Sequence, residues 1–115
     1  MNFNTHRIRA KDHLKAGDLL TIRVVAKNQV KPEKVQEFTD LCKNLIKETL
    51  KEKGCIEYGI YQELENPGIL TFLEEWKDEN SLKEHLNSRH FKETFPLLSE
   101  CVEKETEVNI YRKKL

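Results

Sequence analysis

Hydrophobic residues recur in this chain with two different periods, and the order of these periods constrains the fold more than any other feature. From Leu20 to Ala26 every second residue is apolar, which is typical of a strand with one buried face. From Pro32 to Lys53 apolar residues recur three and four positions apart, which indicates a helix. Pro32 suits the first turn of this helix, and we expect Gly54 to end it in a left-handed conformation.

The period of two returns twice after this helix. Residues 55–61 alternate and lead into a turn of Asn, Pro and Gly at 66–68, after which residues 69–77 alternate again. We therefore expect the two strands to form an antiparallel hairpin. Their expected inward faces carry Ile56, Tyr58 and Ile60 in the first strand and Leu70, Phe72, Glu74 and Trp76 in the second.

A second helical stretch and a last strand complete the pattern. Asp78 can cap a short helix, and the helical spacing continues beyond it as far as Val102. Pro96 falls inside this stretch, so we expect a break or kink there. Residues 106–111 alternate as a fourth strand. The apolar face of the short helix carries Leu82, His85 and Leu86.

The order strand, helix, hairpin, broken helix, strand predicts an α+β protein with the ferredoxin-like βαββαβ fold, in which both helices cover one face of an antiparallel sheet. The length of 115 residues suits one core. We assign this domain to residues 19–115 and interpret residues 1–18 as an accessory or tag-like N-terminal extension.

The second face of the sheet is too apolar to face water, because large side chains alternate with the inward ones on several strands. These side chains are Val25, Tyr61, Ile69, Leu73 and Tyr111. A partner sheet is the simplest cover for them, so we expect a homodimer.

Composition argues against several classes of function. Lys and Arg together number 20, as do Asp and Glu, and the two signs are intermixed, so we expect no nucleic-acid binding. Apolar runs of only a few residues predict no membrane span, and the first 18 residues hold no stretch typical of a secretory signal. Three cysteines without a CxxC pair fit reduced thiols, so we expect a cytoplasmic protein.

The residues that could support chemistry are few. The glycines are too dispersed for a phosphate-binding loop, so we expect no nucleotide cofactor. His85 and His90 are five positions apart, about 140° around a continuous helix, and would not chelate one metal ion from it. His85 shares the apolar helix face, where it could be a general base that faces a pocket or a core histidine bonded to a backbone carbonyl.

Polar side chains on the strands could act together with His85. Glu74 lies on an apolar face beside Trp76, where its carboxylate could orient His85 or bind a substrate hydroxyl, or could reach solvent at the strand end. Tyr58 and Asn28 offer further polar contacts, although Asn28 could equally be a turn residue.

Four segments together resemble the antibiotic biosynthesis monooxygenase family, and especially its small bacterial quinol monooxygenase-like members. They are VVAKNQVKPEK at residues 24–34, GCIEY at 54–58, EEWKD at 74–78 and EHLNSRHF at 84–91. The resemblance extends over about residues 20–112. It implies a dimeric α+β barrel with a pocket between the sheet and the helices of each protomer.

Several members of that family oxidise quinols or phenols with dioxygen and use neither metal nor flavin. The resemblance implies the same activity here, because a deprotonated quinol can itself reduce dioxygen while the protein binds it, deprotonates it and excludes water. It further implies that His85 and Asn28 are catalytic and handle the substrate oxygen, with no cofactor or metal. The substrate-binding residues would be Trp76, Tyr58, Glu74, Phe72 and Leu82.

Two alternative functions stay open. A similar branch of proteins degrades haem and matches this chain at Asn28, but Phe95 occupies the position of the histidine that ligates iron in that branch. His85 likewise occupies the position of a tryptophan in that branch. Other members of the family have no demonstrated activity, so a non-enzymatic dimeric domain that binds a small ligand or serves in a stress response is the other alternative.

Overall fold

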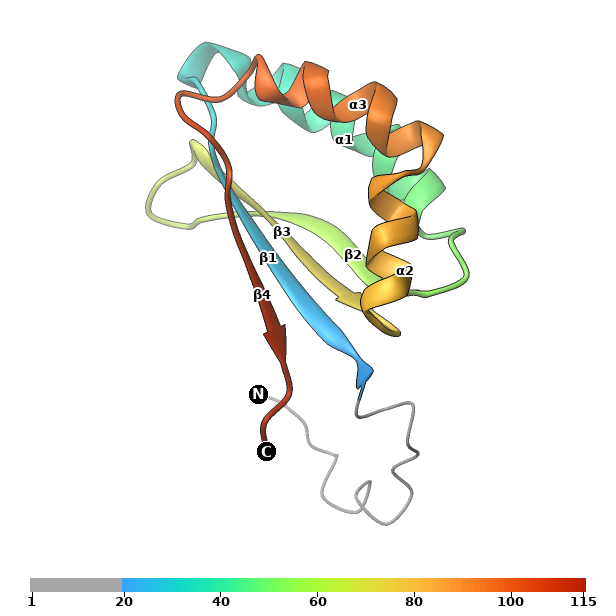
Figure 1. Cartoon of the computed structure of the whole chain (residues 1–115). Helices are drawn as coiled ribbons and strands as arrows, with labels where there is room; N and C mark the ends of the chain where they lie inside the picture. The colour runs from blue at the N-terminus through green and yellow to red at the C-terminus, as the bar shows by residue number, and fades with distance from the viewer. Residues whose placement is uncertain (1–19) are drawn as a thin grey trace.

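The computed structural model describes residues 20–115, which form a four-stranded antiparallel sheet with its helices on one face (Figure 1). The elements are β1 (Ile22–Gln29), the 3-10 helix η3 (Pro32–Lys34), α1 (Val35–Thr49), β2 (Cys55–Gln62), β3 (Ile69–Trp76), α2 (Glu79–Leu86), α3 (Arg89–Ser99) and β4 (Glu107–Arg112). The strand order β2-β3-β1-β4 confirms the predicted ferredoxin-like α+β fold. The extension predicted over residues 1–18 lies outside the described residues.

The core lies between the sheet and the helices, as the alternation of the strands predicts. β1 buries Val24 and Ala26, whose partners across the ladder in β3 are Glu74 and Phe72. Residues directly opposite each other point to the same face, so these four side chains belong to one layer. Phe38 of α1 is fully buried against this layer, with its ring centroid 6.3 Å from that of Phe72.

The inward face of β2 differs from the prediction at Ile56, which is about half exposed. β2 and β3 change register between Cys55 and Glu57, so Ile56 is the extra residue of a β-bulge. The prediction of an inward Ile56 was wrong because strict alternation assumes a regular ladder. Tyr58 is buried as predicted, and Cys55 and Ile60 pack against the core.

The first helix is shorter than predicted, and Gly54 does not end it. α1 stops at Thr49, Leu50 continues in a right-handed conformation, and residues 51–54 form turns that lead to β2. Gly54 lacks a left-handed φ angle, so the predicted cap is wrong. A Cβ atom at Gly54 would lie 2.0 Å from Oγ and 2.3 Å from Cβ of Ser81, so glycine is needed there for the close approach of α2.

The second helical stretch is broken, but not at the predicted residue. The break falls at residues 87–88, between α2 and α3, whereas α3 continues through Pro96. Ser88 caps α3, because its hydroxyl accepts a hydrogen bond from the amide of Phe91 at 3.3 Å. The same hydroxyl donates to the carbonyl of His85 at 2.6 Å, which satisfies a backbone group at the end of α2.

β4 is an edge strand, and all six of its residues are exposed. Val108 and Ile110 pair with Ala26 and Val24 of β1 and therefore point toward the helix side of the sheet. Each of them is nevertheless more than half exposed, so the helix side of the sheet is open along this edge.

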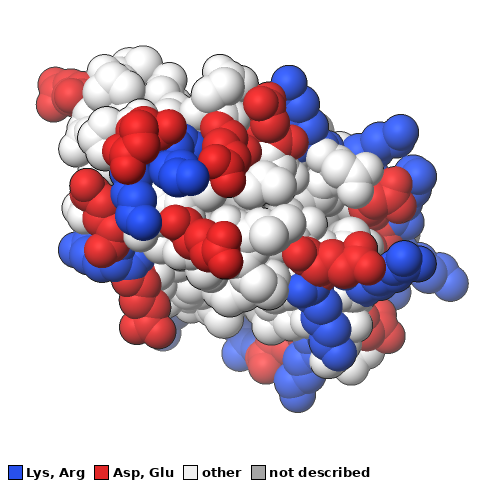
Figure 2. All heavy atoms as spheres, turned by 90° about the horizontal axis from the view of Figure 1, so that it is seen from above, with Lys and Arg blue, Asp and Glu red and all other residues white. Residues whose placement is uncertain are grey.

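The opposite face of the sheet carries the apolar side chains that the sequence places there. Val25 and Leu73 are direct partners and are half-buried, while Tyr61 and Tyr111 are about half exposed. Viewed from above in Figure 2, acidic and basic side chains alternate over the surface without a field of one sign. Among the described helices, none is both long enough and apolar enough to cross a membrane.

Candidate functional site

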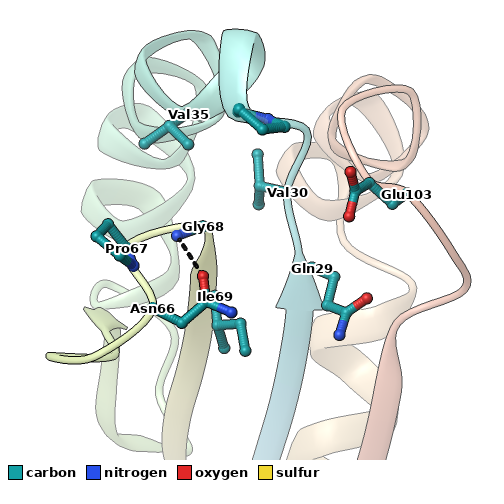
Figure 3. Close-up of a pocket in the computed structure, with 9 residues that line it drawn as sticks. Gln29, Val30, Val35, Asn66, Pro67, Gly68, Ile69 and Glu103 are labelled. Atoms are coloured by element: carbon teal, nitrogen blue, oxygen red, sulfur yellow. Dashed lines mark hydrogen bonds between the residues drawn. The ribbon is translucent and has the colours of Figure 1, made fainter.

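A hollow of about 390 Å³ lies where the end of β1 meets the turn between β2 and β3 (Figure 3). Its walls include Val30, Val35 and the turn residues 66–68, and Glu103 is its one ionisable lining residue. None of the predicted site residues lines it. A single exposed carboxylate gives this hollow little capacity for acid–base chemistry.

A smaller and more apolar pocket of about 120 Å³ lies between the sheet and the helices α2 and α3. Six of the seven predicted site residues line it, namely Asn28, Tyr58, Phe72, Glu74, Leu82 and His85. The seventh, Trp76, is fully buried outside the lining. Cavities of roughly 150 Å³ bind benzene, so the pocket has room for about one aromatic ring. Phe95, Val108 and Ile110 complete the wall toward the open edge of the sheet.

The start of α2 fixes the position of His85. The carboxylate of Asp78 accepts hydrogen bonds from both the amide and the hydroxyl of Ser81, each at 2.8 Å. This N-cap anchors the first turn of α2, and Ser81 also packs closely on Gly54 of the preceding turn. His85 lies four residues after Ser81 and therefore on the same side of the helix.

The His85 ring is buried among aromatic side chains and is only 1% exposed. Its centroid lies 4.7 Å from that of Trp76 and 5.0 Å from that of Phe91. Nδ1 lies 2.7 Å from Oε2 of Glu52, whereas Nε2 is buried and has no hydrogen-bond partner among the described residues. Of the two interpretations of His85, the one in which it faces a pocket matches its surroundings, because its ring lines the pocket and has no hydrogen bond to a backbone carbonyl among the described residues.

Burial lowers the pKa of His85 below its ordinary value, while the hydrogen bond and the negative charge of Glu52 act in the opposite direction. The imidazole is therefore neutral at neutral pH. A neutral ring with its proton on Nδ1 has a free lone pair on Nε2, which is the form that a general base requires.

Glu74 is a second buried titratable group on the pocket wall. It is 6% exposed and accepts a hydrogen bond of 2.8 Å from Nε1 of Trp76, so it does not reach solvent at the strand end. Burial raises its pKa to about 7, the Trp76 hydrogen bond lowers it, and the charge of Glu52 raises it. The carboxyl group can therefore hold or release a proton near neutral pH. It contacts Trp76, and the carboxylate that contacts His85 is that of Glu52.

Tyr58 and Phe72 are two aromatic residues that line the pocket. The centroid of the Tyr58 ring lies 5.4 Å from that of Phe72 and 5.2 Å from that of His85. Burial raises the pKa of the Tyr58 hydroxyl, and the charge of Glu74 raises it further, so the phenol stays protonated.

Asn28 lies within β1 rather than in a turn, and its side chain is 3% exposed. Its Nδ2 donates to the carbonyls of Ala26 and Leu70 at 3.2 and 3.0 Å, and its Oδ1 accepts from the hydroxyl of Thr106 at 2.7 Å. Both N–H groups are thus occupied, and one lone pair of Oδ1 is left for another donor.

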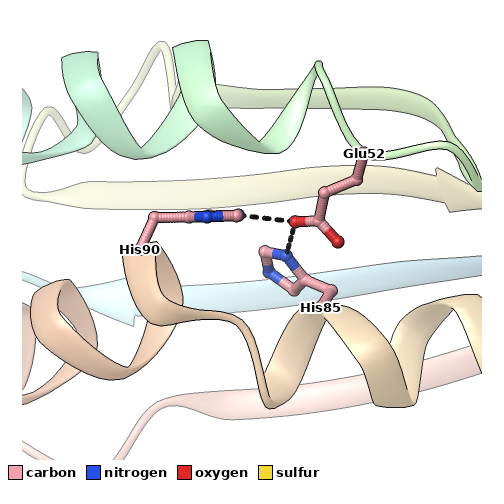
Figure 4. Close-up of side chains that lie close together, drawn as sticks. All are labelled: Glu52, His85 and His90. Atoms are coloured by element: carbon pink, nitrogen blue, oxygen red, sulfur yellow. Dashed lines mark hydrogen bonds and ion pairs between the residues drawn. The ribbon is translucent and has the colours of Figure 1, made fainter.

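Glu52, in the turn between α1 and β2, brings two histidines together (Figure 4). Its Oε2 lies 2.7 Å from Nδ1 of His85 and 2.6 Å from Nε2 of His90. The three residues offer ligand atoms within 4.8 Å of one another, a set that could bind zinc. With zinc–ligand bonds of about 2.0 Å, two ligand atoms of a tetrahedral zinc ion lie about 3.3 Å apart. The distances from the histidine nitrogens to Oε2 of Glu52 are shorter than this, so they are hydrogen-bond distances.

The sequence did not indicate Glu52. The chain has 20 Asp and Glu residues, and only the position of Glu52 just before the GCIEY segment distinguishes it. The partnership of His85 with His90 was also missed, because the 140° separation assumes a continuous helix. The break at residues 87–88 changes the direction of the chain and lets both rings reach one oxygen.

Comparison with known proteins agrees with this fold. The family model for antibiotic biosynthesis monooxygenase matches residues 21–97, more than half of the chain. A conserved protein from Methanosarcina mazei Go1 has a crystal structure with a TM-score of 0.84 and 75% identity, over 88% of this chain and all of that one. A crystal structure of an antibiotic biosynthesis monooxygenase has a TM-score of 0.78 and 26% identity, over 82% of this chain and 99% of that one.

A sequence relative from Synechocystis sp., the protein sll1783, is 32% identical over 90 residues. That match covers 77% of this chain but 61% of the relative, so this chain spans less than two thirds of that protein's length. The extent of the family match and the agreement of the folds lead to one conclusion. The chain belongs to the antibiotic biosynthesis monooxygenase family.

Proposed function

We propose that this chain is a cofactor-independent monooxygenase that oxidises a small aromatic quinol or phenol with dioxygen. The observation that supports this most directly is that Nε2 of His85 is buried at an apolar pocket the size of about one ring and has no hydrogen-bond partner among the described residues. A neutral imidazole in this position can take the proton of a substrate hydroxyl. The apolar wall excludes the water that would otherwise compete for that proton.

The reaction needs no electron donor other than the substrate. Nε2 of His85 accepts the hydroxyl proton, and the resulting phenolate gives one electron to dioxygen. The two radicals combine to form a C–O bond, and the O–O bond then breaks. One oxygen atom stays on the ring as a quinone oxygen, and the other leaves as water with the ring hydrogen and the proton that His85 held.

The other pocket residues have supporting roles in this proposal. Asn28 can accept one hydrogen bond from a substrate hydroxyl through the remaining lone pair of Oδ1. Glu74, with its pKa near 7, can exchange a proton with a second hydroxyl of a quinol. Tyr58 and Phe72 provide aromatic ring faces on which the substrate can pack. Trp76 holds the other two groups in place: its Nε1 donates a hydrogen bond to Glu74, and its ring packs against the ring of His85.

Haem degradation is less well supported. Phe95, at the position where the haem-degrading branch has its iron ligand, lies on the pocket wall and stacks on Phe91 with centroids 5.2 Å apart. A phenyl ring cannot ligate iron, so the pocket offers an apolar surface where that chemistry needs a donor atom.

Oxygen consumption with a panel of single-ring hydroquinones and phenols tests the proposal. We expect uptake above the spontaneous rate, with oxygen and substrate consumed in equal amounts, and a loss of about a hundredfold in kcat for His85→Gln. Tyr58→Phe is the matched control, because it removes one polar group from the same pocket without removing the base. No quinol-dependent uptake by the wild type, or unchanged uptake by His85→Gln, would refute the proposal. Tight ligand binding without turnover would support the non-enzymatic alternative instead.

A further inference from the structure

We infer that Glu52 and His90 are positioning residues for His85: Glu52 fixes the imidazole in the tautomer that leaves Nε2 free, and His90 holds Glu52 in place. The catalytic part of this inference rests on the proposed function. The geometric part does not, because it concerns the protonation of three side chains in the protein without substrate.

The shared oxygen defines where the protons lie. A carboxylate oxygen has lone pairs and no hydrogen, so it can only accept hydrogen bonds. Nδ1 of His85 and Nε2 of His90 both lie within 2.7 Å of Oε2 of Glu52, so both nitrogens carry hydrogens. Neutral His85 with its proton on Nδ1 must have its lone pair on Nε2, the atom that has no partner among the described residues.

The burial of the three residues differs in a way that suits this division of roles. The side chain of His85 is 1% exposed, whereas those of Glu52 and His90 are 16% and 18% exposed. The base is therefore shielded from solvent, whereas the two residues that hold it are partly exposed. Water reaches the outer pair and not the reacting nitrogen.

The fold brings these residues together through two local features. The turn after α1 carries Glu52 toward the helices, and Gly54 in the same turn permits the close approach of α2. The break at residues 87–88 then lets His90 of α3 reach the same oxygen as His85 of α2. Without the break, the two rings would point about 140° apart around one helix.

The charges around His85 determine how stable its protonated, positively charged form is. Among the described residues, the titratable groups in contact with its ring are Glu52 from the turn, His90 from α3 and Tyr58 from β2. Glu52 stabilises the positive charge that appears when Nε2 accepts the substrate proton, because an opposite charge in contact favours the charged form. Protonated His90 disfavours that charge, and Tyr58 stays neutral.

Nitrogen NMR of histidine-labelled protein tests the geometric part without any substrate. We expect the wild type to show His85 as a single Nδ1–H tautomer, and Glu52→Gln to show a mixture together with a further fall in the pKa of His85, because the carboxylate that raises it is gone. Glu63→Gln is the matched control, because it removes the same charge from an exposed side chain that follows β2, whereas Glu52 precedes that strand. An unchanged tautomer and titration in Glu52→Gln would overturn the inference.

Steady-state kinetics tests the catalytic part. Glu52→Gln should lose about tenfold or more in kcat with little change in KM, because the positioning acts on proton transfer and not on ring binding. His90→Leu should lose part of the rate, and His90→Gln, which keeps an N–H donor, should recover most of that loss. Equal rates in His90→Leu and wild type would contradict the role of His90.

Two further outcomes separate this inference from its alternatives. One equivalent of bound zinc in the purified protein, absent from His90→Leu, would show that the cluster is a metal centre and would overturn the inference. If the wild type consumes no oxygen with any quinol, the proposed function fails, while the NMR result still decides whether Glu52 fixes His85. If circular dichroism shows that Glu52→Gln is unfolded, the NMR test of the His85 tautomer is made instead by comparing His90→Leu with His90→Gln.

Discussion

The contact between Gly54 and Ser81 leads to a prediction about stability. In Gly54→Ala the new methyl carbon would lie 2.3 Å from Cβ of Ser81, whereas carbon atoms pack at about 3.5–4.0 Å. A shift of more than about 1 Å is therefore needed, and a change of rotamer cannot provide it because Cβ is fixed to the backbone of α2. Overpacking of this kind costs about 1–3 kcal/mol, and we expect a value near the upper end.

Urea unfolding and a double-mutant cycle measure this cost. Gly54→Ala should lose about 2–3 kcal/mol of unfolding free energy and roughly 10 °C in Tm. Ser81→Gly alone should lose about 1–2 kcal/mol, because it lowers helix propensity and removes the hydroxyl bonded to Asp78. In that background Gly54→Ala should cost little, so we expect a coupling energy of about 2 kcal/mol. Additive effects, or a Gly54→Ala variant as stable as the wild type, would refute the reasoning.

Four other outcomes are expected. Glu74 has a pKa of about 7 when folded and an ordinary value of 4.5, so its stabilising contribution is present below about pH 4.5 and is lost as pH rises through 7. Glu74→Gln should therefore gain roughly 3 kcal/mol of stability relative to wild type between about pH 4 and pH 8 in urea titrations, and a constant difference would contradict this. Light scattering at micromolar concentration should give a dimer mass that Leu73→Lys halves, whereas a monomeric wild type would refute the homodimer. Treatment with EDTA should leave quinol-dependent oxygen uptake unchanged, and a loss that zinc restores would refute metal-free chemistry. Titration with haemin should produce no shifted Soret band, since Phe95 offers no ligand, and a shifted band would reopen haem binding.

The periods of the hydrophobic pattern were sufficient to predict the fold, because each element buries one face and the order of the elements leaves few arrangements. They could not predict features that depend on a single extra or missing residue. The bulge that exposes Ile56 adds one residue to β2. The break at residues 87–88 is marked in the sequence only by Ser88, the N-cap of α3, and a single serine does not distinguish a cap from other polar positions. Pro96 was the stronger signal for a break, yet α3 includes it.

The candidate site was predictable where a polar residue interrupts an apolar face. His85 and Glu74 occupy positions where the periodicity of α2 and β3 calls for apolar side chains, and both line the pocket. Glu52 follows no such pattern, because it lies in a turn where charged residues are ordinary. Its role depends on a contact across 33 positions of sequence, which a single sequence without relatives does not encode in any local signal.

The energetics of the buried polar groups favour a hydroxylated ligand over a bare hydrocarbon ring. Leaving a buried hydrogen-bonding atom unpaired costs about 1–3 kcal/mol, and Nε2 of His85 is such an atom among the described residues. This cost does not stabilise the fold. The burial of the Glu74 carboxyl, which together with the charge of Glu52 raises its pKa, adds to the cost. Buried polar groups that destabilise the fold in this way are found mainly at functional sites. In the proposed reaction, a phenolic hydroxyl that donates to Nε2 pairs this atom, so binding and deprotonation of the substrate would begin from the same hydrogen bond.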